Sequence, residues 1–267
     1  MTLLDVRLTI DYPGRPGVLD EACFTVRRGE IVGLVGSSGS GKSSLALALL
    51  RLLELKGGRA SGSIHFNGRE LMACKEREMR AIRGKEMAFV PQSPSSSLNP
   101  ALRLSTQILE AYRAHANGSS SGGERAVRHA IEQVGLPADP AFLRRYPGEV
   151  SVGQAQRVLI AMAILHGPEL LIADEATSSL DLISQAEVLR LLARLNRECG
   201  MGILYISHDL ASITGFCDRV AILHDGRIVE FGDTARVFET PQHPYAQALI
   251  GALPNGLRRS VQWARES

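Results

Sequence analysis

The most informative run in this chain is Gly36-Ser37-Ser38-Gly39-Ser40-Gly41-Lys42-Ser43. It fits the pattern G-x-x-x-x-G-K-[ST], in which glycines let the backbone curl until several N–H groups point inward at a phosphate. Residues 30–35 before it are typical of a buried strand, and residues 44–50 after it are typical of a helix. The run therefore lies at a strand-to-helix turn, which is the context that the phosphate-binding pattern requires. The alternative is a Gly/Ser-rich turn that binds nothing.

The pattern gives two of these side chains a chemical role. Lys42 would reach the β- and γ-phosphates of a nucleoside triphosphate as a point charge, and the Ser43 hydroxyl would bind Mg²⁺. The positive end of the dipole of the following helix would face the same phosphates. The predicted nucleotide-binding residues at this turn are Gly36, Ser37, Ser38, Gly39, Ser40, Gly41, Lys42, Ser43 and Ser44.

Composition limits the classes of protein to consider. The chain has 267 residues, which suits one large α/β domain or a domain with an inserted subdomain. Hydrophobic residues make up 45% and charged residues 22%, as is usual for globular proteins in water. The net charge is only +2, so composition gives no reason to expect a nucleic-acid partner.

The cysteines and the apolar runs indicate in which cellular compartment the protein is expected. The cysteines at 23, 74, 199 and 217 form no C-x-x-C pair, which favours reduced thiols over disulfides or a metal site. No apolar run reaches the roughly 18 residues that a membrane-spanning helix needs. Residues 1–5 lack the layout of a signal peptide. We therefore expect any connection to a membrane to be made through a partner.

Hydrophobic periodicity divides the chain into strands and helices. Residues 2–10 and 18–27 are expected to be strands joined by a turn-rich loop over 11–17, forming an antiparallel flank to the strand before the phosphate-binding turn. Further strands are expected over 63–68 (ending in an Asn-Gly turn), 86–90, 170–175, 202–207, 220–223 and 227–231. Helices are expected over 76–83, 102–115, 124–134, 154–166 and 182–197.

Strands that alternate with helices indicate a mostly parallel, three-layer α/β fold. The composition changes after the strand at 86–90, and residues 93–158 are interpreted as a helical insertion in the α/β core. Within the insertion, residues 93–100 are a Ser/Pro-rich loop and residues 117–123 a flexible polar linker. Residues 256–267 are basic and then mixed in character and are expected to fray.

Two acids and a histidine follow predicted strands. Asp174 would hold Mg²⁺, and Glu175 would act as general base for an attacking water. His208 follows the strand over 202–207, at the edge where open α/β sheets bind their ligands, and would contact a γ-phosphate. The alternatives are solvated acids at a strand end and a histidine with a structural role.

Taken in order, these residues resemble the nucleotide-binding subunit of an ATP-binding-cassette (ABC) transporter, over about residues 3 to 254. The motifs that carry the resemblance are the phosphate-binding turn, Gln92 after a strand, Ser151-Val152-Gly153-Gln154 before a helix, Asp174-Glu175, Ser178-Ser179-Leu180-Asp181 and His208. Several are weak alone, but six in this order are specific.

The resemblance implies roles for individual residues. Tyr12 would stack on the adenine ring, and the alternative is a loop aromatic that covers the edge of the core. Gln92 would touch Mg²⁺ and the attacking water and border the contact with a membrane subunit. The signature residues Ser151, Gly153 and Gln154 would cap the γ-phosphate of ATP held by the opposite subunit. Asp181 would communicate across that dimer interface, and His208 would stabilise charge on the transferred phosphoryl group.

The implied protein is an ATPase that energises an importer. Its catalytic residues would be Lys42, Gln92, Glu175 and His208, and its Mg²⁺ ligands Ser43, Gln92 and Asp174. Its partners would be a second ABC ATPase subunit, identical or different, two transmembrane permease subunits and, indirectly, an extracytoplasmic solute-binding protein. The expected location is peripheral, on the cytoplasmic face of the inner membrane. The expected domains are a P-loop core with an antiparallel β part (1–92 and 159–240), a helical subdomain (93–158) and a C-terminal extension (241–267).

Two stretches resemble a subgroup of this family, the oligopeptide, dipeptide and nickel importer ATPases. They are Gln92-Ser93-Pro94-Ser95-Ser96-Ser97-Leu98-Asn99-Pro100 and Pro241-Gln242-His243-Pro244-Tyr245-Ala246-Gln247-Ala248-Leu249. Because no cysteine follows Cys217, we expect no C-terminal iron–sulfur cluster. The signature departs from Leu-Ser-Gly-Gly-Gln at Val150 and Val152, and Ala176 stands where importers often have proline. Since Val152 is β-branched, that position cannot need a positive φ.

Rival interpretations remain. A soluble ABC protein that acts on DNA or ribosomes usually carries two cassettes, a zinc or coiled-coil insertion, or basic extensions, and none is visible here. A regulatory subunit that binds ATP without splitting it would be expected to lack Glu175 or His208. An exporter would commonly be fused to a transmembrane domain.

Overall fold

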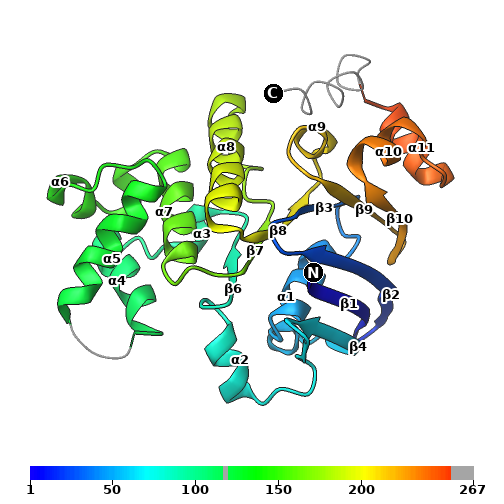
Figure 1. The fold of residues 1–267 in the computed structure, drawn as a ribbon, viewed down its shortest axis with the longest axis horizontal. Coiled ribbons are helices and arrows are strands. Elements are labelled where there is room, and N and C mark those ends of the chain that lie inside the picture. Colours follow the sequence, from blue (N-terminus) through cyan, green and yellow to red (C-terminus); the bar gives the residue numbers. More distant parts are fainter. Residues whose placement is uncertain (117–119, 254–267) are drawn as a thin grey trace. The chain divides into compact units, whose positions relative to one another are not determined.

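The computed structural model describes residues 1–116 and 120–253, and the chain divides into two units. The first unit comprises Met1–Met79 and the described residues from Gly200 onward, and the second comprises Arg80–Cys199. Figure 1 shows their elements along the chain. In the described ranges, no helix is both long enough and apolar enough to cross a bilayer.

An antiparallel sheet forms one part of the first unit. Its strand order is β2-β1-β4-β5. The strands are β1 (Thr2–Tyr12), β2 (Arg15–Arg27), β4 (Arg59–Phe66) and β5 (Arg69–Glu70). Because Tyr12 pairs with Arg15, the loop expected over 11–17 shrinks to a two-residue turn. The Asn67-Gly68 turn between β4 and β5 has positive φ at both residues (50° and 76°), which confirms the predicted Asn-Gly turn.

A second sheet of the first unit carries the phosphate-binding turn. Strand β3 (Ile31–Gly36) pairs in parallel with β8 (Gly202–Ser207) on one side and with β9 (Arg219–His224) on the other, and β9 pairs antiparallel with β10 (Arg227–Asp233). Every residue of β3 and β8 is buried, as expected for parallel strands covered on both faces. The helices of this unit are α1 (Lys42–Leu49), η1 (Leu53–Lys56), α9 (Leu210–Thr214), α10 (Thr234–Glu239) and α11 (Pro244–Gly251). Helix α2 (Glu76–Ile82) lies where the chain passes into the second unit.

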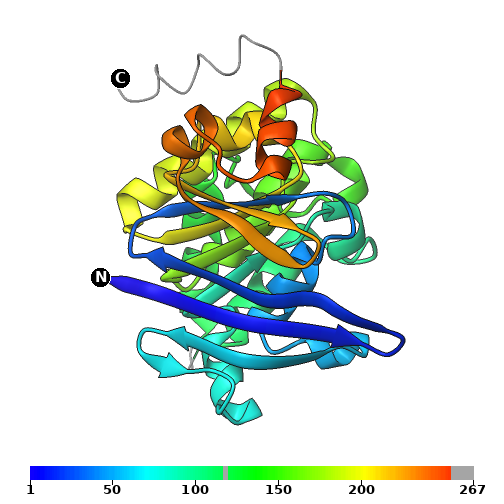
Figure 2. The same ribbon diagram turned by 90° about the vertical axis from the view of Figure 1, so that its right-hand side faces the viewer.

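The C-terminal helix is anchored to the β9–β10 hairpin, which is orange in Figure 2 beneath the red α11. The ring of Tyr245 stacks on the ring of His224 with a centroid separation of 3.6 Å and an angle of 9°. The carboxylate of Glu230 accepts hydrogen bonds from the backbone N–H groups of Gln242 and His243. The His-Pro-Tyr sequence therefore has a structural role, in addition to its value as a mark of a subgroup.

The second unit combines a parallel strand pair with a group of helices. Its strands are β6 (Met87–Val90) and β7 (Leu170–Asp174), which pair in parallel. Its helices are α3 (Pro94–Ser97), α4 (Leu104–Arg113), α5 (Ser120–Gln133), α6 (Pro140–Leu143), η2 (Pro147–Glu149), α7 (Val152–Ile164) and α8 (Leu182–Cys199). Helix α7 is central, because it contacts β6, α3, α4, α5 and α8 (Figure 1).

The structure corrects three expectations in this unit. Residues 120–123 begin α5 and are not part of a linker, because Gly123 lets the helix approach α4 so closely that an added Cβ would lie 2.6 Å from Leu109. Residues 94–97 form the short helix α3 inside the expected loop. Helix α7 begins at Val152, so Gly153 lies within it. The rest of the expected linker, residues 117–119, and the tail over 256–267 lie outside the described residues.

Candidate functional site

The phosphate-binding turn joins β3 to α1 in the first unit. Gly41 precedes α1 in a left-handed conformation (φ 103°), and an added Cβ there would lie 2.9 Å from Leu19 and 3.0 Å from the Val18 carbonyl oxygen. Glycine is therefore required at this position by both conformation and space. Residues 37–39 at the crest of the turn are exposed.

Lys42 lies at the base of the turn. Its side chain is 5% exposed, and its Nζ donates hydrogen bonds to the carbonyl oxygens of Gly36 and Ser37, both at 2.9 Å. Ser43, in the first turn of α1, is exposed. A buried cation, a hydroxyl and a helix N-terminus form a donor set that fits a magnesium-bound triphosphate.

Tyr12 lies at the end of β1, beside α1. Its hydroxyl lies 3.0 Å from Ser44 Oγ in the first turn of that helix, and its ring packs against Gly58, where an added Cβ would lie 3.0 Å away. Arg15, at the start of the next strand, donates a hydrogen bond to the Gly39 carbonyl oxygen at 3.2 Å. The sequence did not single out Arg15, since its approach to the turn depends on the hairpin between β1 and β2.

Strand register explains the position of His208. Val35 of β3 pairs in parallel with Ser207 of β8, so the turn that follows Gly36 and the turn that carries His208 both begin at the same edge of the sheet. His208 is exposed there, and the turn that carries it is fixed by hydrogen bonds from the Asp209 N–H to Ser207 Oγ (3.0 Å) and from the Ala211 N–H to Asp209 Oδ1 (2.9 Å). The first unit thus brings His208 to the edge of the sheet where the phosphate-binding turn begins.

In the second unit, candidate site residues likewise follow the ends of two paired parallel strands, β6 and β7. Val90 pairs with Ala173, so Gln92 and Glu175 each come two residues after a paired position. The Gln92 Nε2 donates a hydrogen bond to Glu175 Oε2 at 2.8 Å. Asp174, the last residue of β7, is 7% exposed. The predicted glutamine, general base and Mg²⁺ ligand therefore lie together at one end of these strands.

Glu175 has an unusual backbone. Its φ is +49°, a left-handed conformation that costs a non-glycine residue on the order of 1–2 kcal/mol. The turn that follows is held by hydrogen bonds to the Glu175 carbonyl oxygen from the Ser178 N–H at 3.1 Å and from Ser178 Oγ at 3.0 Å. A sharp turn directly after a buried strand therefore fixes the position of the Glu175 carboxylate.

The signature residues form the start of α7. Ser151 is the N-cap, its Oγ accepting a hydrogen bond from the Gln154 N–H at 3.2 Å, while Gln154 Oε1 accepts one from the Ser151 N–H at 3.1 Å. A serine hydroxyl that accepts one hydrogen bond can still donate another. The geometry therefore leaves Ser151 able to donate to a phosphate, as the sequence predicts.

Asp181 caps α8 close to the signature residues. Its carboxylate accepts hydrogen bonds from the N–H groups of Ile183 and Ser184, both at 3.0 Å, and from Ser184 Oγ at 2.7 Å. These bonds, chiefly those from Ser184, lower the pKa of Asp181. An added Cβ on Gly153 would lie 3.4 Å from Ser184 Oγ, so the starts of α7 and α8 are in contact.

Arg157 is a residue of this region that the sequence analysis missed. It forms a 2.6 Å ion pair with Glu187 of α8 and donates a hydrogen bond to the Val134 carbonyl oxygen at 3.2 Å. It therefore joins α7 to α8 and to the end of α5. Its partners lie 23 and 30 residues away in sequence, so no local pattern indicates them.

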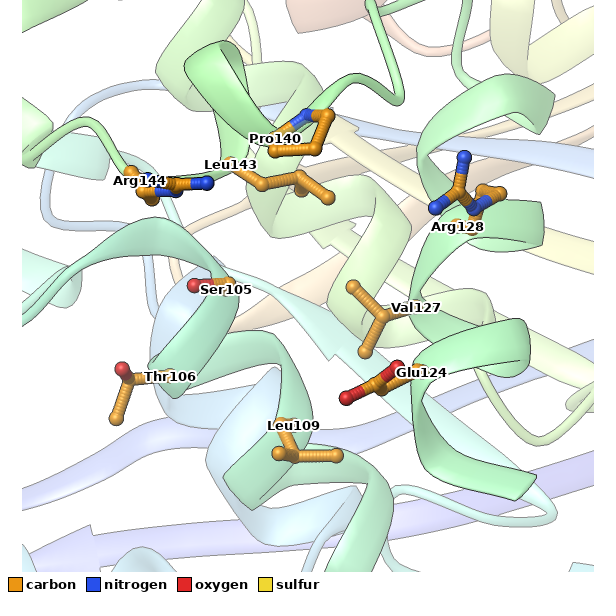
Figure 3. Close-up of a pocket in the computed structure, with 9 residues that line it drawn as sticks. All are labelled: Ser105, Thr106, Leu109, Glu124, Val127, Arg128, Pro140, Leu143 and Arg144. Carbon is orange, nitrogen blue, oxygen red and sulfur yellow. The ribbon is translucent and has the colours of Figure 1, made fainter. Parts of the chain in front are cut away.

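A separate hollow of about 320 Å³ lies among α4, α5 and α6 (Figure 3). Leu109, Val127 and Leu143 line its apolar part, and the guanidinium groups of Arg128 and Arg144 lie on opposite sides of it. None of the predicted site residues lines it.

The sequence profile of the ABC transporter family matches residues 19–178, which is more than half of the chain. The chain belongs to the ABC transporter family. It is an ABC transporter ATPase, a protein that binds ATP and couples its hydrolysis to transport. The prediction of the family from the ordered motifs is thus confirmed.

Two relatives indicate to which subgroup of the ABC transporter family the chain is similar. The chain is 41% identical to the oligopeptide transport ATP-binding protein OppD of Escherichia coli (strain K12) over 256 residues, which is 95% of this chain and 75% of OppD. It is 40% identical to the dipeptide transport ATP-binding protein DppD of the same strain over 258 residues, 95% of this chain and 79% of DppD. This ABC ATPase therefore groups with the ATP-binding proteins of peptide importers.

Solved structures share the fold of this ABC ATPase. A structure described as the ATP-binding subunit of an ABC transporter is 30% identical, with a TM-score of 0.72, over 98% of this chain and all of that one. The dimeric ATP-binding cassette MJ0796 bound to ADP and phosphate has a TM-score of 0.73 at 24% identity, over 88% of this chain and 99% of that one. The predicted α/β fold, with an antiparallel β part, mostly parallel strands and a helical insertion, is confirmed. The predicted domain boundaries and the roles of single residues stay predictions.

Proposed function

We propose that this ABC ATPase powers the uptake of peptides through a membrane importer, by hydrolysing ATP in a dimer of ATPase subunits. The observation that carries the hydrolytic part is the 2.8 Å hydrogen bond from Gln92 to the carboxylate of Glu175. A subunit that only bound nucleotide would have no need of a general base held in this way. Support for peptides as cargo comes from the similarity to OppD and DppD, and nickel is the other cargo that the sequence resemblance suggests.

The proposed chemistry assigns a task to each group. Glu175 accepts a proton from water, whose oxygen attacks the γ-phosphorus while the bond to the β–γ bridging oxygen breaks. Lys42 and His208 stabilise the negative charge of the transferred phosphoryl group, and Gln92 orients the water. Tyr12 stacks on the adenine. The side chains of Ser43, Gln92 and Asp174 would hold Mg²⁺, which when bound neutralises charge on the β- and γ-phosphates.

The proposed dimer completes the site. Two ATPase subunits pair head to tail, and Ser151, Gly153 and Gln154 of one subunit cap the γ-phosphate bound to the other. Ser151 supports this assignment, because its hydroxyl caps a helix start yet keeps a proton to donate. Asp181, fixed next to the signature residues, would report the state of one site to the other.

The proposed partners beyond the dimer are two permease subunits and, indirectly, an extracytoplasmic binding protein that selects the peptide. The ATPase would be peripheral, on the cytoplasmic face of the inner membrane. Opening and closing of the dimer would move the helical subdomain and so push on the permeases. No charge pattern in the chain favours a nucleic-acid partner.

The test compares two variants of the purified chain. Glu175→Gln should retain ATP binding while phosphate release falls at least 100-fold, because the water loses its base. Lys42→Ala should lose most of the affinity for ATP. Phosphate release unchanged by Glu175→Gln would remove Glu175 from its proposed role. Uptake of labelled peptides or nickel by cells with and without the gene would decide the cargo.

A further inference from the structure

The hollow among α4, α5 and α6 has the size of a site for a small molecule (Figure 3). Its volume of about 320 Å³ lies at the lower end of the range for ligand pockets in proteins. Its lining residues recur three or four positions apart along each helix, so one face of each helix is turned toward the hollow. All three helices belong to the second unit.

Contacts within the second unit hold the walls of the hollow in place. The Leu104 N–H at the start of α4 donates a hydrogen bond to the Arg145 carbonyl oxygen, just after α6, at 2.9 Å. The Asp139 carboxylate caps α6 by accepting a hydrogen bond from the Phe142 N–H at 2.9 Å. Gly123 brings α5 into close contact with α4. The hollow is therefore pre-formed, and a ligand would not have to order its walls.

Three charged side chains line the hollow. The guanidinium groups of Arg128 and Arg144 lie on opposite sides of it, and the carboxylate of Glu124 points from α5 toward α4 (Figure 3). Among the residues whose side chains the structure describes, none pairs with these three charged groups through an ion pair or a hydrogen bond. Two cations and one anion are therefore available to a ligand.

The rest of the lining is mainly apolar. We define the apolar floor as Leu109, Val127 and Leu143, one residue from each helix. Because exposed ion pairs contribute little by themselves, burial of apolar surface against this floor would supply much of the affinity for a ligand. The lining therefore suits a molecule with an apolar body and charges of both signs.

We propose that the hollow binds a short apolar peptide in its free, zwitterionic form. Its carboxylate pairs with Arg144, its ammonium group pairs with Glu124, and its side chains pack on the apolar floor. The inference rests on the proposed function, since peptides are the proposed cargo. Two arginines against one glutamate leave the lining with a net charge of +1, which favours the carboxylate end.

The spacing of the charges and the volume together select a dipeptide. Glu124 lies on α5, whereas Arg144 directly follows α6, so the two charges of the ligand must be separated. A free amino acid carries both charges on one carbon atom and could not reach both groups. Each further residue lengthens an extended chain by about 3.3–3.6 Å, so a long peptide would exceed a hollow of this size.

Isothermal titration calorimetry of the purified full chain with the dipeptide leucyl-leucine measures the binding. We expect a Kd of about 1 mM or lower. Leucyl-leucine with both ends blocked, and glycyl-glycine, should bind at least tenfold more weakly, because one lacks the charges and the other the apolar side chains. Arg144→Gln and Glu124→Gln should each raise the Kd at least fivefold. Matched controls are Arg125→Gln and Glu132→Gln, exposed residues of α5 that do not line the hollow, and they should leave the Kd unchanged.

The blocked dipeptide tests the two charged contacts on the native chain, so the result does not depend on the folding of any variant. Equal binding of the free and blocked dipeptides, or no binding of leucyl-leucine, would overturn the site. So would a Kd that rises as much in the controls as in the lining variants. Binding of the chain to phosphatidylethanolamine vesicles but not to the dipeptide would also overturn it, because the zwitterion would then be a lipid head group.

The proposed function is tested by other measurements, namely ATP turnover by the purified chain and uptake of labelled peptides by cells. Neither requires the hollow, so Arg144→Gln should leave phosphate release unchanged. Intact peptide uptake without dipeptide binding would refute the site alone. Absence of ATP turnover or of peptide uptake would instead refute the proposed function.

Discussion

Replacement of Glu175 separates its proposed catalytic role from the strain in its backbone. Both Glu175→Ala and Glu175→Gly remove the carboxylate that Gln92 contacts, so both should abolish hydrolysis. They differ only in how well the new residue tolerates a φ of +49°. Alanine keeps the steric penalty of the left-handed conformation, whereas glycine has none.

The expected difference in stability follows from two opposing terms. The left-handed conformation costs alanine roughly 1–2 kcal/mol. Glycine loses roughly 0.5–1 kcal/mol more conformational entropy on folding than alanine does. Glu175→Gly should therefore have a higher free energy of unfolding than Glu175→Ala, by about 0.75 kcal/mol if the midpoints of the two ranges are subtracted. For a protein of this size, that difference raises the melting temperature by about 1–4 °C.

Urea unfolding followed by circular dichroism provides the measurement, with phosphate release measured on the same samples. Ala173→Gly, two residues earlier in the buried strand β7, is the control and should be less stable than the native chain. Equal stability of Glu175→Gly and Glu175→Ala would show that the turn is not strained, and the argument from the backbone would fail.

Three further outcomes are expected. Tyr12→Phe keeps the ring and should change ATP affinity less than threefold, whereas Tyr12→Ala should weaken it at least tenfold if the ring stacks on adenine, as measured by nucleotide titration. Burial raises the pKa of the Cys217 thiol well above its ordinary value, so iodoacetamide at pH 8 should label the exposed cysteines of the native protein and reach Cys217 only on unfolding. Burial, and then His166, lower the pKa of His115, so the unfolded chain binds its proton more readily. The free energy of unfolding should therefore fall as the pH drops below about 6.5, and His115→Asn should flatten that dependence in urea titrations at several pH values.

Much of the position of the candidate site residues could be predicted, because within each unit the parallel strands end together. The sequence places Asp174-Glu175 and His208 directly after apolar runs, and strand pairing then decides where those residues lie. The register of Val35 with Ser207 aligns two strand ends in the first unit, and the register of Val90 with Ala173 aligns two in the second. The order of the motifs was also enough to identify the family.

The errors came from packing between segments far apart in sequence. Residues 120–123 are Ser-Ser-Gly-Gly, which has poor helix propensity, yet they form the start of α5 because Gly123 packs tightly on α4. Arg157 and Arg15 were missed because their hydrogen-bond partners come near them only in the folded chain. Local patterns could not show that Tyr245 stacks on His224, since 20 residues separate the two rings in the chain.

That stacked pair has a practical consequence for any polypeptide joined to this end. Two contacts hold the chain at the start of α11. Tyr245 stacks on His224, and Glu230 accepts hydrogen bonds from the backbone of residues 242 and 243. A reporter or affinity label fused after α11 would therefore follow a helix that is held on the first unit. Truncation of the chain before residue 241 would instead expose the ring of His224 and the carboxylate of Glu230, and we expect it to promote aggregation.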